Sequence, residues 1–116
     1  MNRTFIMTPQ FDKQWEKMGL TDNDLHCLQL EILENPKVGT VIQGTGGLRK
    51  MRFALNDRGK SGGARVVYVD FVIYRTVYLI HAYPKSEKED MTDEERKNLC
   101  KAVKQIEQAL ARRNST

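Results

Sequence analysis

The stretch ARVVYVDFVIYRTVYLIHAY, residues 64–83, decides the fold of this chain. It contains two runs rich in β-branched and aromatic residues, 64–73 and 76–83, and only two residues separate them. Such runs are typical of strands, and so short a separation predicts an antiparallel hairpin. The earlier run LRKMRFA, residues 48–54, alternates in the manner of a half-buried strand. The middle of the chain therefore predicts a three-stranded antiparallel sheet.

Two helices are predicted before this sheet. Residues 9–19 place apolar side chains at helical spacing. Thr21 then follows as an N-cap, with Asp24 three residues later as in a capping box. The pair Asn35-Pro36 ends the second helix, because proline lacks a backbone donor and restricts the residue before it. The short join between the two helices predicts an αα-hairpin.

A short strand over residues 3–7 and a final helix complete the predicted elements. Thr92 and Glu95 form another capping box, and an amphipathic pattern follows them. We expect the apolar stripe of this helix to pack on the sheet, with a partner-binding face as the alternative. The predicted order is β-α-α-β-β-β-α. It defines one α+β domain over residues 1–116, with two N-terminal helices and a C-terminal helix packed on an antiparallel sheet.

Composition narrows the class of protein. Hydrophobic residues make up 40% of the chain, which is ordinary for a globular domain. No run approaches the roughly 18–20 apolar residues that a membrane helix needs, and the N-terminal stretch lacks the apolar core of a secretion signal. We therefore expect a cytoplasmic protein with no membrane partner.

The two cysteines are predicted to be free thiols. Cys27 and Cys100 are far apart in the sequence and no CxxC motif is present. A metal site built from these two cysteines with His26 and His81 is the alternative, although the spacing matches no zinc pattern. We expect neither a metal nor another cofactor.

Positive charge is concentrated in the middle of the chain. The net charge is +4, yet residues 43–65 hold six cations and a single acid. Such a local excess attracts polyanions, and a solvated basic face without a partner is the alternative interpretation. The six cations are Arg49, Lys50, Arg52, Arg58, Lys60 and Arg65.

Strand pairing predicts that several of these cations meet on one surface. Side chains on the same face of adjacent strands lie opposite one another, so Lys50 and Arg52 can lie near Arg65. Lys85 follows the last strand and can reach the same rim. Cations beside aromatic rings suit single-stranded RNA, because cations contact phosphates and rings stack on unpaired bases. The aromatic candidates are Tyr68 and Tyr83, and His81 is either structural or a proton-transfer group.

Such a surface can also cleave RNA. RNA carries its own nucleophile, the 2′-OH, which an enzyme needs only to orient and deprotonate while it stabilises the added negative charge. Arginine suits charge stabilisation because it stays protonated and matches phosphate oxygens, whereas a lysine serves as base only where neighbouring cations lower its pKa.

Three stretches of this sequence resemble a known family. They are IQGTGGLRKMRFA, RGKSGGARVVY and LIHAYPKSE, and they resemble the HigB-type branch of the RelE/ParE toxin superfamily. The resemblance covers nearly the whole chain. It implies a toxin of a bacterial toxin–antitoxin pair that binds the ribosomal A site, cleaves the messenger RNA there, and is held inactive by a HigA-like antitoxin.

The resemblance also implies roles for particular residues. Its catalytic positions match Lys50, Arg52 and Arg65, with Lys85 as a looser match. The aromatic acid/base residue of some relatives has no clear equivalent here, since Met91 and Thr92 stand in that region. The general acid is therefore unassigned, with two candidates, Tyr83 and His81. The expected RNA-binding set is Arg49, Arg58, Lys60, Tyr68, Tyr83 and His81.

Two other functions remain open from the sequence. A ParE-like inhibitor of DNA gyrase uses the same fold, so the fold alone cannot decide between them. A nucleic-acid-binding module without activity is the other alternative. The dense set of cations on the predicted second and third strands favours RNA cleavage.

Overall fold

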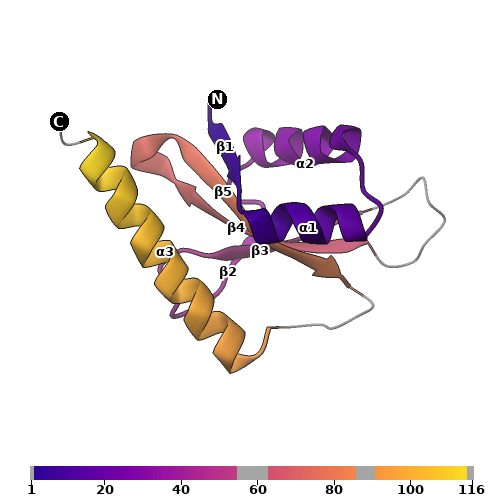
Figure 1. Ribbon diagram of the computed structural model, residues 1–116. Helices are drawn as coiled ribbons and strands as arrows, with labels where there is room; N and C mark the ends of the chain where they lie inside the picture. Colours follow the sequence, from indigo (N-terminus) through magenta and orange to yellow (C-terminus); the bar gives the residue numbers. More distant parts are fainter. Residues whose placement is uncertain (1, 55–62, 86–90, 115–116) are drawn as a thin grey trace.

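The computed structural model describes residues 2–54, 63–85 and 91–114. Within these ranges a five-stranded sheet carries helices on both faces, as Figure 1 shows. The strands lie in the order β1-β5-β4-β3-β2. The strands are β1 (Thr4–Met7), β2 (Thr40–Val41), β3 (Arg49–Phe53), β4 (Ala64–Phe71) and β5 (Thr76–Pro84), and the helices are α1 (Pro9–Lys17), α2 (Asp22–Glu34) and α3 (Asp93–Asn114).

The predicted α+β class and the three antiparallel central strands are confirmed, and the sheet extends further on both sides. The first strand, β1, pairs in parallel with β5, so the sheet is mixed. The short strand β2 pairs with β3 at the opposite edge, in a stretch for which no strand was predicted. Neither pairing can be recognised from neighbouring residues in the sequence. Parallel strands are not joined by a hairpin turn that would mark the pair, and a strand of two residues is too short to show an alternating pattern.

Local chemistry explains where the helices begin. The Thr21 hydroxyl accepts from the Asp24 N–H at 3.1 Å, and the Asp24 carboxylate accepts from the Thr21 N–H at 2.9 Å. Thr92 and Glu95 make the same reciprocal pair ahead of α3, with distances of 2.9 and 3.1 Å. Both predicted capping boxes are therefore present, and each satisfies donors that a helix N-terminus leaves open.

The sheet separates two apolar cores, because alternate residues of a strand point to opposite faces. Helices α1 and α2 bury residues such as Phe11 and Leu28 against one face. Helix α3 buries Val103 and Leu110 against the other. The first core includes Phe11, Trp15, Leu28, Ile32, Met51, Phe53, Ala64, Val66 and Tyr68, and the second includes Leu48, Val67, Val69, Ile80, Tyr83, Met91, Val103 and Leu110.

The hairpin between β4 and β5 forms as predicted, although its first strand ends earlier than expected. Strand β4 ends at Phe71, and a 3₁₀ turn over Val72–Tyr74 with Arg75 at φ 50° completes the reversal. Register also shifts between Val67 and Tyr68. The shift inserts one extra residue into β5. Side chains on the two sides of this residue therefore no longer alternate between the faces of the sheet in the regular way.

Two further expectations concern cysteines and membranes. Both Cys27 and Cys100 are free thiols, as predicted. None of the helices within the described ranges has the length and apolar character that crossing a bilayer requires.

Candidate nucleic-acid interface

Three cations from two strands share one face of the sheet. On β3, Lys50 and Arg52 alternate with Met51 and Phe53, which are buried in the α1/α2 core. On β4, Arg65 alternates with residues of that same core, so it points to the α3 side as well. Pairing places Arg52 directly opposite Arg65. We call Lys50, Arg52 and Arg65 the basic face.

The geometry of the basic face suits a bound anion. Side chains directly opposite on antiparallel strands have Cβ atoms about 4.5–5.5 Å apart, so Arg52 and Arg65 begin close together. Arg52 is exposed, whereas Lys50 and Arg65 are half-buried. The pairing therefore brings two guanidinium groups, which match phosphate oxygens, to one end of the sheet.

Strand β5 extends the two cross-strand rows of this face. Arg52, Arg65 and Tyr83 follow one another across β3, β4 and β5. The parallel row contains Lys50, Val67 and His81. The rings of His81 and Tyr83 lie 5.3 Å apart between centroids, which joins the two rows at β5.

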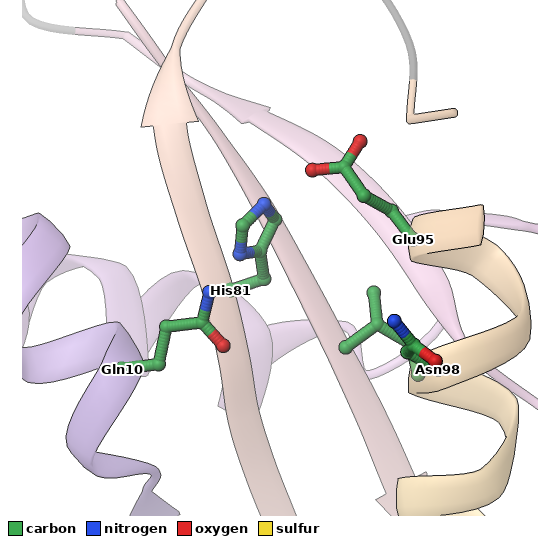
Figure 2. Close-up of a pocket in the computed structure, with 5 residues that line it drawn as sticks. Gln10, His81, Glu95 and Asn98 are labelled. Carbon is green, nitrogen blue, oxygen red and sulfur yellow. The ribbon is translucent and has the colours of Figure 1, made fainter. Parts of the chain in front are cut away.

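His81 lines a pocket between α1 and α3 (Figure 2). The residue is only 6% exposed, and its Nδ1 lies 2.9 Å from Nε2 of Gln14 on α1. The same Gln14 amide accepts a hydrogen bond through Oε1 from the Ala82 N–H at 2.8 Å. In Figure 2 the His81 ring lies between Gln10 on one side and Glu95 on the other. The pocket lining is Gln10, His81, Glu95, Asn98 and Leu99.

Two predicted RNA-binding residues, Arg49 and Tyr68, lie on the face opposite the basic face, so the expectation that Tyr68 adds an aromatic ring to that surface was wrong. Tyr68 is fully buried in the α1/α2 core. Arg49 is paired with Tyr68 on that side, and its Nη1 donates to the Gly39 carbonyl at 2.7 Å. The cause is the two-residue period of a strand, which separates Arg49 from its neighbour Lys50 and gives Tyr68 the opposite orientation to Arg65.

Tyr83 is on the expected face but does not offer a stacking surface. It is 4% exposed and belongs to the core under α3. An unpaired base needs access to an aromatic face in order to stack on it. Tyr83 therefore lies beside Arg65 in the same cross-strand row, with its ring buried.

The remaining predicted residues are placed differently. Lys85 is half-buried, and its backbone N–H donates to the Gly63 carbonyl at 3.0 Å, which puts it at the same end of the sheet as Arg65. Arg58 and Lys60 lie outside the described residues.

The glycine-rich stretch ahead of β3 forms the turn that leads into the basic face. Gly44, Gly46 and Gly47 adopt φ values of 77°, 76° and 114°, which side-chain-bearing residues rarely adopt. The turn is closed by a hydrogen bond from the Ile42 N–H to the Leu48 carbonyl at 2.8 Å. The glycines thus position β3 without contributing side chains to the interface.

Gln14 is the residue that the sequence did not reveal. Gln14 lies on α1, and 66 residues separate it from His81 along the chain. A contact over this distance cannot be predicted from a pattern of neighbouring residues. Glu95 was predicted only as a helix cap, a role that it does have. Among the residues that the structure describes, no group of three or more His, Cys, Asp or Glu side chains is arranged to hold a metal ion.

Solved structures of the RelE toxin share this fold. The chain is 22% identical to a double arginine-to-alanine mutant of Escherichia coli RelE in the free state, with a TM-score of 0.55 over 77% of this chain and 90% of that chain. It is 23% identical to the intact E. coli RelBE toxin–antitoxin complex, with a TM-score of 0.54 over 70% of this chain and 94% of that chain. It is 23% identical to the isolated E. coli RelE toxin, with a TM-score of 0.52 over 90% of this chain and 98% of that chain.

The family itself follows from the sequence model. The model for the RelE toxin of the RelE/RelB toxin–antitoxin system matches residues 3–114. This chain belongs to the RelE toxin family.

Proposed function

We propose that this protein is a HigB-type toxin that inhibits translation by cleaving messenger RNA in the ribosomal A site. Membership of the RelE toxin family supports a role in a toxin–antitoxin system. The observation that carries the proposal further is the pairing of Arg52 opposite Arg65, with Lys50 on the same face. This arrangement suits a single phosphodiester, since guanidinium groups pair with phosphate oxygens.

The proposed reaction uses the RNA 2′-OH as the nucleophile. Its oxygen attacks the adjacent phosphorus, the bond to the 5′-oxygen of the next nucleotide breaks, and a 2′,3′-cyclic phosphate forms, while the departing 5′-oxygen takes up a proton and leaves as a hydroxyl group. Arg52 and Arg65 stabilise the extra negative charge, and Lys50 is the candidate base for the 2′-OH proton. Lys85 lies at the same end of the sheet and is the fourth candidate.

The proposed partners follow from this site. A sparse set of cations orients flexible RNA poorly, so we propose that the ribosome holds the message in the reactive geometry. The target places the protein in the cytoplasm. A HigA-like antitoxin is the proposed inhibitor, in keeping with a toxin family defined by its antitoxin partner.

The test is a cell-free translation reaction in which primer extension maps breaks in the message. Wild-type protein should give breaks in register with codons. Replacing Arg52 or Arg65 with alanine should reduce cleavage by on the order of 10²-fold each, the usual cost of removing one preorganised charge-stabilising group. The matched control is Lys37→Ala, which removes an exposed cation outside the basic face and should cut normally.

Two results would contradict the proposal. Unchanged cleavage by the double variant of Arg52 and Arg65 would place the active surface elsewhere. Intact message together with inhibited DNA supercoiling by purified gyrase would instead identify a ParE-like inhibitor.

A further inference from the structure

A second group of cations lies on α3 and is separate from the basic face. Residues 96–104 of this helix contain four cations and no acid. The acids of α3 all lie outside this segment, at positions 93–95 and 107. The four cations are Arg96, Lys97, Lys101 and Lys104, and we call them the α3 patch.

Helical spacing brings the α3 patch to one side of the helix. Successive residues of an α-helix are about 100° apart around the axis, so the four positions fall within an arc of about 140°. Val103 and Leu110 lie outside this arc and are buried against the sheet. The α3 patch therefore occupies a flank of the helix that its packing leaves accessible.

This flank forms one wall of a pocket, and the glycine-rich turn ahead of β3 forms another. The pocket has a volume of about 270 Å³. Cys100 lies within the arc, and its Sγ is 3.6 Å from the Gly44 carbonyl oxygen, so the helix and the turn are in contact. Figure 1 shows α3 beside the segment that joins β2 to β3. An added Cβ at Gly44 would meet no atom within 4 Å, so the turn leaves space here.

The three lysines of the α3 patch are not neutralised by neighbouring acids. Lys97, Lys101 and Lys104 are exposed, and none of them makes a hydrogen bond or an ion pair within the ranges that the structure describes. Arg96 differs, because its Nη1 lies 3.4 Å from the Asp93 carboxylate. Lys97 and Lys101 are four residues apart, a spacing at which like charges oppose helix formation. A bound anion would relieve this repulsion.

The size and chemistry of the pocket suit a single phosphate group. The pocket is smaller than the roughly 300–1,000 Å³ of sites that hold whole small molecules or cofactors. A lysine ammonium is a compact charge with three donors on a flexible stem, so it contacts phosphate oxygens without requiring a fixed geometry. Such contacts hold a nucleic-acid backbone independently of its sequence.

The α3 patch lies within reach of a partner bound at the basic face. Helix α3 packs on the side of the sheet to which the basic face points. Gly44 borders the pocket and precedes Lys50 by six positions, a length of chain that spans at most about 20 Å. One RNA-containing partner can therefore contact both surfaces.

We propose that the α3 patch binds an RNA phosphate other than the one that is cleaved. This inference rests on the proposed function, which makes RNA the ligand. The α3 patch anchors the RNA backbone and takes no part in the reaction, so its contacts are equally strong before and during cleavage. Loss of these contacts should raise KM and leave kcat unchanged. The phosphate belongs to the message or to ribosomal RNA, and two binding assays separate these sources.

The first assay measures binding of a 2′-O-methyl single-stranded RNA by fluorescence anisotropy. The methyl group blocks the nucleophile, so binding is measured apart from cleavage. The affinity of wild-type protein should fall with salt, with a log–log slope of about 0.7 for each phosphate neutralised. The double variant Lys97→Ala/Lys101→Ala should bind about 3–10-fold more weakly at low salt and show a slope smaller by about 0.7 or more.

The second assay measures cosedimentation of the same proteins with ribosomes that carry no message. Weaker binding of the double variant here, with unchanged binding to the oligonucleotide, would assign the phosphate to ribosomal RNA. Weaker binding to the oligonucleotide would assign it to the message. The matched control for both assays is Lys13→Ala, which removes an exposed lysine of α1 on the other side of the sheet and should bind as wild type does.

Thermal unfolding separates a binding role from a structural one. The double variant removes like charges from α3, so its Tm should be unchanged or slightly higher. Should it unfold more easily, two single variants replace it: Lys104→Ala should weaken RNA binding, and Lys101→Arg, which keeps the charge, should not.

Distinct results bear on the α3 patch and on the proposed cleavage. Wild-type-like binding by the double variant in both assays, an equal loss in Lys13→Ala, or no binding of either RNA by wild-type protein at low salt would overturn this inference. The α3 patch would then be a solvated surface without an RNA partner. A toxin that binds RNA through the α3 patch but never cuts message on ribosomes would overturn the proposed function and leave this inference intact.

Discussion

Replacing Tyr68 with phenylalanine removes one oxygen atom that holds two buried backbone groups. The Tyr68 hydroxyl donates to the Pro36 carbonyl at 2.9 Å and accepts from the Gly39 N–H at 2.9 Å. The ring, Pro36 and Gly39 are all buried. The change therefore leaves one donor and one acceptor without the partner that they have in the native protein.

The expected cost follows from these two groups. A buried polar group without a partner costs about 1–3 kcal/mol, and the segment near Pro36 can shift slightly, so we expect a loss of about 2–4 kcal/mol in the free energy of unfolding. For 116 residues the entropy of unfolding converts this loss to a fall of roughly 8–16 °C in Tm. Urea and thermal unfolding followed by circular dichroism measure both quantities. The control is Tyr78→Phe, whose hydroxyl bonds to none of the described residues and whose change should stay within about 0.5 kcal/mol.

The dependence on pH provides a second measurement of the same bond. Burial raises the pKa of Tyr68 above its usual value, because the charged phenolate is poorly solvated there, although the hydrogen bond from Gly39 opposes the shift. A raised pKa in the folded state means that the stabilising effect of the phenol is complete below about pH 10 and is lost as pH rises further. The stability difference between wild type and Tyr68→Phe should therefore narrow above about pH 10. A difference below 1 kcal/mol at neutral pH, or one that widens in alkali, would refute the reasoning.

Three further predictions concern single sites. Asp70→Ala should lower the free energy of unfolding, measured in urea, by about 3–5 kcal/mol. The reason is that the largely buried guanidinium of Arg3 bonds Asp70 at 2.8 and 3.2 Å and would lose this partner. A loss under 1 kcal/mol would contradict this reasoning. Gly39→Ala should lower Tm by several degrees, since an added Cβ would lie 2.8 Å from the Tyr68 ring, and an unchanged Tm would show that the ring moves freely. Lys50→Arg should keep RNA affinity in a filter-binding assay yet slow cleavage at least tenfold, because arginine does not readily give up its proton; full activity would remove Lys50 as the base.

Sequence reasoning succeeded where the determining contacts are local. The capping box of Thr21 and Asp24 spans three residues and forms as predicted. The placement of Lys50 and Arg52 on one face follows from the two-residue period of a strand. Both rules depend only on near neighbours, so a single sequence contains all the information that they need.

The same period, applied strictly, would have avoided the errors. Tyr68 is three residues from Arg65, an odd separation that places the two side chains on opposite faces of β4. Arg49 is one residue from Lys50 and is separated from it in the same way. The strand therefore places the tyrosine and the arginine of this run on different surfaces.

Other features depend on contacts that no local rule supplies. The parallel pairing of β1 with β5 joins residues about 70 positions apart, Thr4 with Thr76 for example. The contact of Gln14 with His81 is similar in span and depends on the register shift after Val67 as well. Such pairings are set by the packing of the whole domain, and the residues involved carry no distinctive pattern.

The RVVY run of β4 shows how one short motif can serve two faces. Arg65 points to the basic face, while Tyr68 points into the opposite core and binds the segment at Gly39. The Gly39 carbonyl in turn accepts from Arg49 of β3, so the segment that follows α2 is tied to both strands of the site. These contacts therefore hold β3, which carries Lys50, from the face of the sheet opposite the basic face. Stability and cleavage should separate cleanly under mutation, because a change at Tyr68 alters how much protein is folded, whereas a change at Arg65 alters what the folded protein does.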